Sequence, residues 1–423
     1  LSDYQTNPNN FVMKSQLIIM LLALLSTGTS FSQSDFSQWR GPNRDGTYPG
    51  ANLLQTWPSG GPQLLWKFDG LGVGYASAAV ANERVITVGT LDSISYLFCF
   101  DMMGVQLWKT RLSRDFMGVY AGTYSTPVIR GDQGFITTGL GMLYCFNTAK
   151  GNVVWSRDLI KEFDGINPLE KGGYLDNLVV DGNLLICAPG GAARNIVALD
   201  QATGTVVWES KGTSEVSGYG TPTLADHKGR KYYFYQDETS IIALNIADGS
   251  VVWTHPRGWG TYVGSLFFHD GYLFYLTEMS SVLLKLADGS NPPQVAWTQS
   301  DFFPLQGDPV LIGNRMYGKS KGKKYLTVDW ATGQTIASIP ATAMVVTSVA
   351  GDGLIYAYDI DGNFSLLKPV ESGVETVGSF KIPGGTKYHC SHPVISNGKL
   401  IVRHDNSLFV YTISTTDIKI AGK

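Results

Sequence analysis

The segment ALDQATGTVVW, residues 198–208, recurs with small changes as CFNTAKGNVVW at 145–155 and as ALNIADGSVVW at 243–253. In each copy a Gly stands four residues after an Asp or Asn, and a Trp stands four residues after that Gly. An Asp or Asn side chain can cap a turn, and Gly takes left-handed backbone conformations at little cost. We therefore predict that this segment is the turn between two antiparallel strands, with the Trp on the second strand.

The same Trp marks a longer period. Six tryptophans follow one another at gaps of 42, 47, 53, 45 and 44 residues: Trp66, Trp108, Trp155, Trp208, Trp253 and Trp297. Units of 40 to 50 residues with four short strands each are typical of propeller blades. One unit divides into predicted strands at 124–130, 134–140, 141–147 and 151–159. We predict that each Trp lies on an outer strand and docks one blade against the next.

Further units keep this frame without the Trp. Residues 328–338 carry Ala337 at the Trp position, and residues 355–368 keep paired aromatic residues. The last unit, 392–414, supplies only three strands, and the strand-like run at 62–68 can supply the fourth and so leave no open edge. The prediction is an all-β, eight-bladed β-propeller whose N-terminal strand closes the last blade. Seven blades would result if the units around 306–380 merged.

The N-terminal residues indicate export. Met13 and Lys14 precede nine apolar residues at 17–25, and Ser30 and Ser32 provide small residues for cleavage near Gln33. Nine residues are too few to span a bilayer, which takes about 20; a buried N-terminal helix is the alternative. We expect a periplasmic or secreted protein with no transmembrane anchor. The predicted divisions are an upstream extension or tag at 1–12, a signal peptide at 13–33, a lead-in segment at 34–61, the propeller at 62–416 and a tail at 417–423.

Composition narrows the class of partner. The net charge of -3 argues against nucleic acid as a partner, because nucleic-acid binding would require a basic stripe on the surface.

The four cysteines, Cys99, Cys145, Cys187 and Cys390, are not adjacent to one another. Cys99 and Cys145 take the same place in successive blades, and packed sheets lie about 10 Å apart, which is too far for a disulfide. We predict buried thiols that act as small hydrophobic groups.

A ligand site, if present, belongs where the innermost strands begin, around the central channel. The aromatic candidates at these starts are Tyr75, Tyr124, Tyr174, Tyr219, Trp259, Tyr262 and Tyr388. The polar candidates are Asp176, Asn177, Asp308, His389 and His392. Aromatic rings with a few polar groups suit a sugar or another flat polar ligand; alternatively the tyrosines only cover the blade ends. Joint metal binding by His389 and His392 would need a turn between them, since odd spacing along a strand points side chains to opposite faces, and we predict no metal site.

The repeat resembles a known family. The pattern A-x-D-x-x-T-G-x-x-x-W, met by Ala198, Asp200, Thr203, Gly204 and Trp208, is similar to the PQQ-like (pyrroloquinoline-quinone-type) repeat. The resemblance covers roughly residues 38–414, and QWRGPNRDG at 38–46 resembles secreted, mostly uncharacterised members. The family's eight-bladed propellers include quinoprotein alcohol dehydrogenases and the non-catalytic outer-membrane assembly factor BamB.

The resemblance implies what a dehydrogenase would need: adjacent cysteines in a disulfide above the quinone, and Ca²⁺ held by Glu, Asn and Asp. This chain has no adjacent cysteines and few acids at the aligned channel positions. We therefore predict no cofactor and no catalytic residues. The expected function is a monomeric, exported, non-catalytic binding or scaffold module of the bacterial envelope, with an envelope protein or an oligosaccharide as partner. The alternative is an enzyme at the channel mouth, either a PQQ-dependent dehydrogenase or a carbohydrate-active enzyme.

Overall fold

The computed structural model describes residues 36–166, 173–175, 177–211, 220–258, 264–277, 279–303, 307–320, 322–341, 346–385 and 389–416. All of them belong to one compact unit, Ser34–Lys423. The predicted extension at 1–12, the signal peptide at 13–33 and the tail at 417–423 lie outside the described residues. Within these ranges no helix has the length and apolar character needed to cross a membrane.

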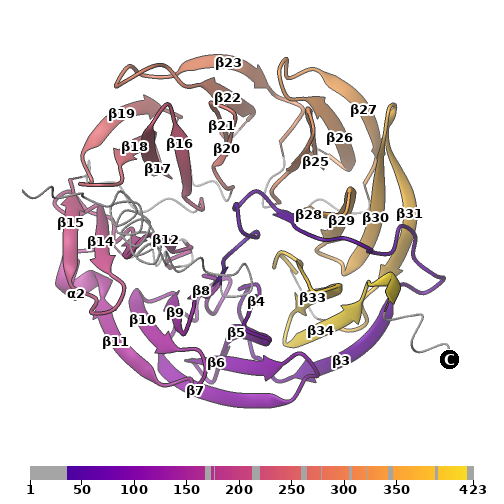
Figure 1. The fold of residues 1–423 in the computed structure, drawn as a ribbon, viewed down its shortest axis with the longest axis horizontal. Helices are drawn as coiled ribbons and strands as arrows, with labels where there is room; N and C mark the ends of the chain where they lie inside the picture. The colour runs from indigo at the N-terminus through magenta and orange to yellow at the C-terminus, as the bar shows by residue number, and fades with distance from the viewer. Residues whose placement is uncertain are drawn as a thin grey trace, which may run out of the picture. The chain divides into compact units, whose positions relative to one another are not determined.

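Eight antiparallel sheets surround a central axis, as the propeller prediction requires (Figure 1). Blades 1 to 4 are β4–β7 (Ala79–Ala81, Arg84–Leu91, Ile94–Asp101, Gln106–Arg114), β8–β11 (Val128–Arg130, Gln133–Thr137, Met142–Asn147, Val153–Asp158), β12–β15 (Val179–Asp181, Leu184–Cys187, Ile196–Asp200, Val206–Ser210) and β16–β19 (Thr223–His227, Arg230–Gln236, Ser240–Asn245, Val251–Pro256). Blades 5 to 7 are β20–β23 (Phe267–His269, Tyr272–Leu276, Ser281–Lys285, Gln294–Gln299), β24–β27 (Val310–Ile312, Arg315–Lys319, Lys324–Asp329, Thr335–Pro340) and β28–β31 (Val346–Gly351, Leu354–Asp359, Asn363–Val370, Gly373–Lys381).

Blade 8 is composite and closes the ring. Its inner strands are β32 (Val394–Ser396), β33 (Lys399–His404) and β34 (Ser407–Thr412), and its outer strand is β3 (Gln63–Asp69) from the N-terminal part of the chain. Trp66 on β3 pairs with Val410 on β34. The predicted count of eight blades and the predicted closure by an N-terminal strand are both confirmed.

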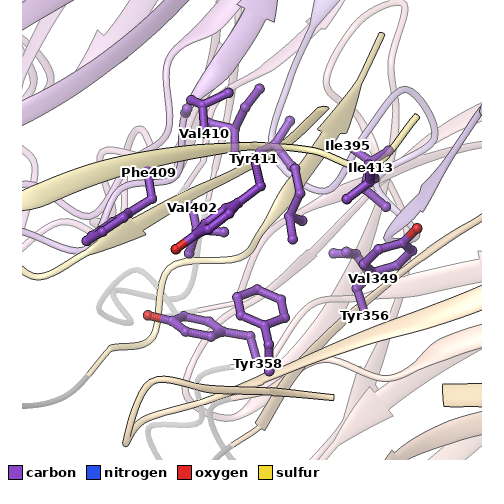
Figure 2. Close-up of a cluster of buried hydrophobic side chains, with 14 of the residues drawn as sticks. Val349, Tyr356, Tyr358, Ile395, Val402, Phe409, Val410, Tyr411 and Ile413 are labelled. Atoms are coloured by element: carbon purple, nitrogen blue, oxygen red, sulfur yellow. The ribbon is translucent and has the colours of Figure 1, made fainter. Parts of the chain in front are cut away.

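The core at this closure joins blades 7 and 8. Val349, Tyr356 and Tyr358 of blade 7 face side chains of blade 8 that include Phe409 and Tyr411 (Figure 2). The same buried cluster also takes in residues of blade 1 and of the lead-in segment. Hydrophobic burial at the closure therefore depends on chain segments from both ends of the sequence.

The repeated turn has the predicted geometry. Asp200 accepts hydrogen bonds at Oδ1 from the backbone N–H groups of Ala202 (3.1 Å) and Thr203 (2.9 Å), and Gly204 has a φ of 69°. Trp155 of blade 2 donates from Nε1 to the Gln201 carbonyl of blade 3 at 2.9 Å. A Cβ on Gly204 would lie 2.8 Å from the Trp155 ring, so only Gly leaves room for it. The turn thus seats the Trp of the preceding blade.

The same contact recurs around the rim. Trp66, Trp108, Trp208 and Trp297 also donate from Nε1 to a carbonyl of the next blade and lie against its turn glycine, namely Gly104, Gly151, Gly249 and Gly333. Trp253 is buried and packs on Phe234, with ring centroids 5.6 Å apart. The prediction that these tryptophans dock neighbouring blades is confirmed at the five seams that show both contacts.

Blade 7 departs from this pattern. In blades 1–5 and in composite blade 8, a β-bulge stands next to the Trp of the outer strand. The outer strand of blade 7, β31, has the same bulge, and there Gly378 pairs with Leu366. Gly378 therefore occupies the position that a Trp occupies in those blades. Trp57 of the lead-in segment fills the space, since a Cβ on Gly378 would lie 2.7 Å from the Trp57 Cβ. The Trp57 ring centroid lies 5.2 Å from that of Phe380. The lead-in segment therefore supplies the ring that blade 7 lacks.

The lead-in segment also crosses the ring. Strand β1 (Phe36–Ser37) pairs with β8 of blade 2, and β2 (Thr47–Tyr48) runs parallel to β28 of blade 7. The residues between them pass through the centre of the ring, as the indigo segment of Figure 1 shows. This crossing was not predicted, and it places the charged motif 38–46 in the channel.

The cysteines lie where the repeat alignment puts them. Cys99 and Cys145 are buried in hydrophobic clusters and take the same register position in blades 1 and 2, opposite Trp108 and Trp155. Burial raises the thiol pKa of each to about 12. Cys187 is buried as well, so these three act as the small hydrophobic groups that were predicted, whereas Cys390 is only partly buried.

Candidate functional site

Polar side chains at the inner-strand starts form bonds between neighbouring blades. Asn177 of blade 3 accepts from the Thr126 backbone N–H of blade 2 at 2.7 Å and donates to Thr221 Oγ1 of blade 4 at 2.9 Å. Asp308 of blade 6 accepts from the Ser265 backbone N–H of blade 5 at 2.7 Å. Two predicted ligand-binding residues, Asn177 and Asp308, thus hold the channel wall together.

The motif QWRGPNRDG fills the channel between these starts. Arg40 is 2% exposed and donates from Nη2 to the Pro309 carbonyl of blade 6 (2.6 Å) and from Nη1 to the Ser348 carbonyl of blade 7 (3.2 Å). Arg44 is 4% exposed and donates from Nη2 to the Leu178 carbonyl of blade 3 at 2.6 Å. Two arginines therefore tether one short segment to three blades across the ring.

A carboxylate and a histidine accompany Arg40. Burial alone would raise the pKa of Asp308, but the Arg40 guanidinium, the neighbouring His392 and the Ser265 backbone N–H together hold it at about 2. His392 Nε2 lies 3.4 Å from Asp308 Oδ2, a close approach without hydrogen-bond geometry. Burial lowers the pKa of His392, and its ring packs edge-on against Trp39 with centroids 4.8 Å apart. Asp308 is therefore a buried, ionised carboxylate, and Arg40, His392 and Ser265 of the same chain stabilise its charge.

The predicted tyrosines divide into two settings. Tyr75 and Tyr124 stack on each other, with ring centroids 4.6 Å apart and planes inclined by 20°, and both are half-buried at the mouth. Tyr174 is 3% exposed, packs in the core between blades 2 and 3, and donates to the Pro189 carbonyl at 2.7 Å. Of these three, only Tyr75 and Tyr124 present surface to the channel mouth.

A rigid loop beside these tyrosines was not foreseen in the sequence. It joins β7 to β8, and the buried Asp115 anchors it. Asp115 accepts five hydrogen bonds, from the hydroxyls of Thr90, Ser95 and Thr123 and from the backbone N–H groups of Phe116 and Gly139. The Gly122 backbone N–H then donates to the Phe116 carbonyl at 2.8 Å and closes the loop. A fully hydrogen-bonded carboxylate of this kind fixes a backbone rather than performing chemistry.

The tip of this loop is apolar and exposed. Met117 is 49%, Val119 76% and Tyr120 45% exposed, and Tyr124 Oη donates to the Tyr120 carbonyl at 2.9 Å. Val73, 40% exposed, precedes the Tyr75 that meets Tyr120 edge-on at 6.4 Å. We call Val73, Met117, Val119 and Tyr120, with the Tyr75–Tyr124 stack, the mouth patch. The signal available in the sequence was the apolar run FMGVYAG within an otherwise polar connection.

The two histidines of KYHCSHP have different neighbours. His389 stacks on His404, with ring centroids 3.6 Å apart, whereas His392 lies against Asp308. His404 Nε2 donates to the Gly384 carbonyl at 3.0 Å, so His404 Nδ1 is the acceptor for Tyr358 Oη at 2.8 Å. Burial and the adjacent His404 lower the pKa of His389 to about 4. The two side chains do not converge on one point, in keeping with their odd spacing.

The remaining candidates lie outside the described residues: Asp176, Tyr219, Trp259, Tyr262 and Tyr388. Within the ranges that the structure describes, no three His, Cys, Asp or Glu side chains are grouped closely enough to hold a metal ion.

Eight four-stranded blades, the Asx–Gly turn with its outer-strand Trp, and a strand-closed last blade together define a PQQ-like repeat β-propeller. The chain belongs to the family described as outer membrane protein assembly factor BamB, whose profile matches residues 95–338.

Two curated relatives resemble the chain over part of their length. BamB of Shewanella oneidensis is 24% identical over 255 residues, which are 55% of this chain and 61% of that protein. Protein Rv3035 of Mycobacterium tuberculosis is 25% identical over 281 residues, 59% of this chain and 67% of that protein. The chain thus spans about three fifths of the length of the BamB relative.

Solved structures share the fold. BamB from Moraxella catarrhalis superposes with a TM-score of 0.60 at 16% identity, covering 83% of this chain and 99% of that one. A quinohemoprotein alcohol dehydrogenase from Pseudomonas putida superposes with a TM-score of 0.63 at 12% identity, covering 90% and 80%. Because an assembly factor and an alcohol dehydrogenase superpose about equally well, the fold does not decide the function.

The channel residues that the structure describes do not fit the quinone and Ca²⁺ that the resemblance to quinoprotein enzymes would imply. Ca²⁺ takes 6–8 oxygen ligands, yet Asp308 and Asn177 are already engaged with Ser265, Thr126 and Thr221. The Arg40 guanidinium adds a positive charge beside Asp308, where a cation would have to bind. No catalytic step through a quinone is therefore derived.

Proposed function

We propose that this protein is an exported, non-catalytic binding module of the bacterial envelope, and that its partner is an envelope protein that docks on the mouth patch. The observation that carries this proposal is the contrast between channel and mouth. The charged groups inside the channel contact the chain's own lead-in segment, whereas apolar side chains at the mouth are presented to solvent.

The mouth patch has the features of a protein-docking surface. Contiguous exposed apolar groups on a soluble protein commonly mark an interaction site. Aromatic residues and Met are enriched at such interfaces, and the patch contains Met117, Tyr120, Tyr75 and Tyr124. The five hydrogen bonds to Asp115 hold the loop in one conformation, which lowers the entropy lost on binding. The family description, an outer-membrane assembly factor, supports an envelope partner.

The proposal is tested by photo-crosslinking in the source organism. A photoreactive amino acid is placed at Val119, which is 76% exposed, and, as a matched control, at Met103, which is 79% exposed. Met103 lies on the turn before β7, whereas the loop that carries Val119 follows β7. We expect a discrete adduct with an envelope protein from position 119 alone. The crosslinked chain should come from the periplasmic or secreted fraction and begin near Gln33.

A second variant separates docking from folding. Met117→Asp, made in the chain that carries the photoreactive amino acid at position 119, places a charge at an exposed position of the patch, so it should abolish the adduct while leaving the Tm unchanged. Equal adducts from positions 119 and 103 would contradict the proposal. So would turnover of alcohols or sugars that requires added quinone and Ca²⁺, since that result would favour the enzyme alternative.

A further inference from the structure

Arg40 sits in surroundings that match a guanidinium rather than a generic cation. Its two terminal nitrogens donate to three carbonyl groups, those of Pro309, Ser348 and Asp45. Pro309 and Ser348 belong to blades 6 and 7, so two fixed acceptors converge on the planar fork from different sheets. An ammonium group, which is a compact point charge, would not reach both acceptors in one plane.

The surroundings also balance its charge. Asp308, next to Pro309 in the chain, is buried and ionised, and the Arg40 charge is among the causes that keep it so. A buried cation without a nearby anion destabilises a protein interior, because its desolvation is not compensated. Here an anion from blade 6 and carbonyl dipoles from blades 6 and 7 compensate one guanidinium.

The shape of the site is fixed on its remaining side. Gly46, with a φ of 79°, approaches the guanidinium so closely that a Cβ there would lie 2.5 Å from Arg40 Nη2. The Gly46 backbone N–H donates back to the Arg40 carbonyl at 2.9 Å. The Trp39 ring centroid lies 5.6 Å from Arg40 Cζ. A side chain at position 46 would therefore collide with the guanidinium, so Gly46 is needed beside it.

Arg44 provides an internal comparison. It lies four residues away on the same segment and is equally buried, but among the described residues its guanidinium bonds only to the Leu178 carbonyl. Its Nη1 has no hydrogen-bond partner there, whereas in Arg40 both terminal nitrogens are bonded and Nε alone lacks a partner. Burial lowers the pKa of Arg44 to about 10. Arg44 is therefore a buried arginine without a complementary site around it.

We propose that the carbonyls of Pro309 and Ser348 form a guanidinium-binding site in the channel, next to the buried Asp308 in the chain, and that Arg40 fills it as an internal ligand. Filling this site locks the lead-in segment across the ring and closes the channel. The chemical class of ligand is an arginine side chain, and the occupant is this chain's own residue.

Chemical rescue tests the site in the full chain. Arg40→Ala should lower the Tm by more than Arg44→Ala, because it leaves Asp308 buried without its counter-charge. Methylguanidinium chloride at about 20–50 mM, well below the molar range in which guanidinium denatures, should restore a large part of the Tm lost in Arg40→Ala. The same concentration of methylammonium chloride should not, and neither salt should raise the Tm of Arg44→Ala.

Arg40→Lys keeps the test decisive if Arg40→Ala does not fold. A site that recognises the planar fork should leave Arg40→Lys with a Tm clearly below that of the wild type. A wild-type Tm for Arg40→Lys would show that charge alone matters and would overturn the proposal. Equal rescue of Arg40→Ala by both salts, or equal rescue of the Arg40 and Arg44 variants, would overturn it as well.

Discussion

The rim of the propeller and its axis are built in different ways. At the rim, one contact is used again and again: Trp155 Nε1 donates to the Gln201 carbonyl at 2.9 Å, and Trp208 Nε1 donates to the Ile246 carbonyl at 3.0 Å. At the axis, the contacts of the lead-in segment each occur once, as when Arg40 reaches carbonyls 269 and 308 residues away in the chain. Repeated interactions leave a period in the sequence, whereas single ones leave none.

The rim also shows what happens when the repeat decays. In blade 6 the Trp position is Ala337, yet Gly373 of blade 7 keeps a φ of 127° and would still place a Cβ only 2.6 Å from the Ala337 methyl group. In blade 7 the position is Gly378, and Trp57 enters from the lead-in segment to fill it. One seam is thus closed by tighter packing, and the next by a residue from outside the repeat.

The largest expected effect comes from removing residues 34–68, which make contacts both at the rim and at the axis. Deleting residues 34–68 takes away β3, Trp57 and the channel segment, which together close blade 8, cover blade 7 and tether blades 3, 6 and 7. Because a typical domain is stable by only about 5–15 kcal/mol and the deletion removes a whole strand of blade 8 together with these contacts, we expect an unfolded or aggregated product. Circular dichroism and size-exclusion chromatography measure this, with a chain beginning at Ser34 as the control. A soluble truncated protein with a cooperative melt would show that rim and axis are independent.

A smaller effect is expected from a single rim contact. Trp208 is 7% exposed, and Trp208→Ala should lower the free energy of unfolding by about 3–5 kcal/mol, the cost of emptying a buried ring site. Val207 is 52% exposed and adjacent in β15, so Val207→Ala should change stability by less than about 0.5 kcal/mol. Urea denaturation of both variants measures the difference. Similar losses of unfolding free energy from Trp208→Ala and Val207→Ala would mean that the Trp208 ring does not stabilise the contact between blades 3 and 4.

The difference between the rim and the axis also explains how much of the structure could be predicted from the sequence. The sequence allowed prediction of the turn at Asp200–Gly204, the docking role of Trp155, and the closing strand around Trp66, because each belongs to a pattern that recurs. It also led to Asp308 and Asn177 as channel residues, although the structure engages them in bonds between blades.

The rest had no periodic signal. The crossing of the channel by residues 38–46 and the seating of Trp57 on Gly378 each depend on partners far away in the chain. Such contacts form only after the ring has brought the blades together. The local signal in the sequence was the composition of this segment. Arg40 and Arg44 stand close to Trp39 in a stretch without a strand pattern. A flexible connection rarely combines a Trp with two closely spaced arginines.

The smallest expected effect is a pH dependence that separates the histidine pair from the channel. His389 has its pKa lowered from 6.5 to about 4, through burial first and then through His404, so the unfolded chain binds more protons than the folded one between these values. This contribution to stability is complete above pH 6.5 and is lost as the pH falls toward 4. A shift of this size corresponds to about 3 kcal/mol at most, and screening by nearby solvent reduces it to about 1–2 kcal/mol. Asp308 responds to pH in a lower range. Its pKa is about 2 in the folded chain and 3.8 in the unfolded chain, so its protonation changes stability only below about pH 4.

Between pH 7 and 5 the melting temperature should therefore fall in the wild type and fall less in His389→Asn, while the exposed control His269→Asn should follow the wild type. Parallel curves for all three proteins would show that the stacked pair does not control stability in this range and that the pH response must originate elsewhere in the ring.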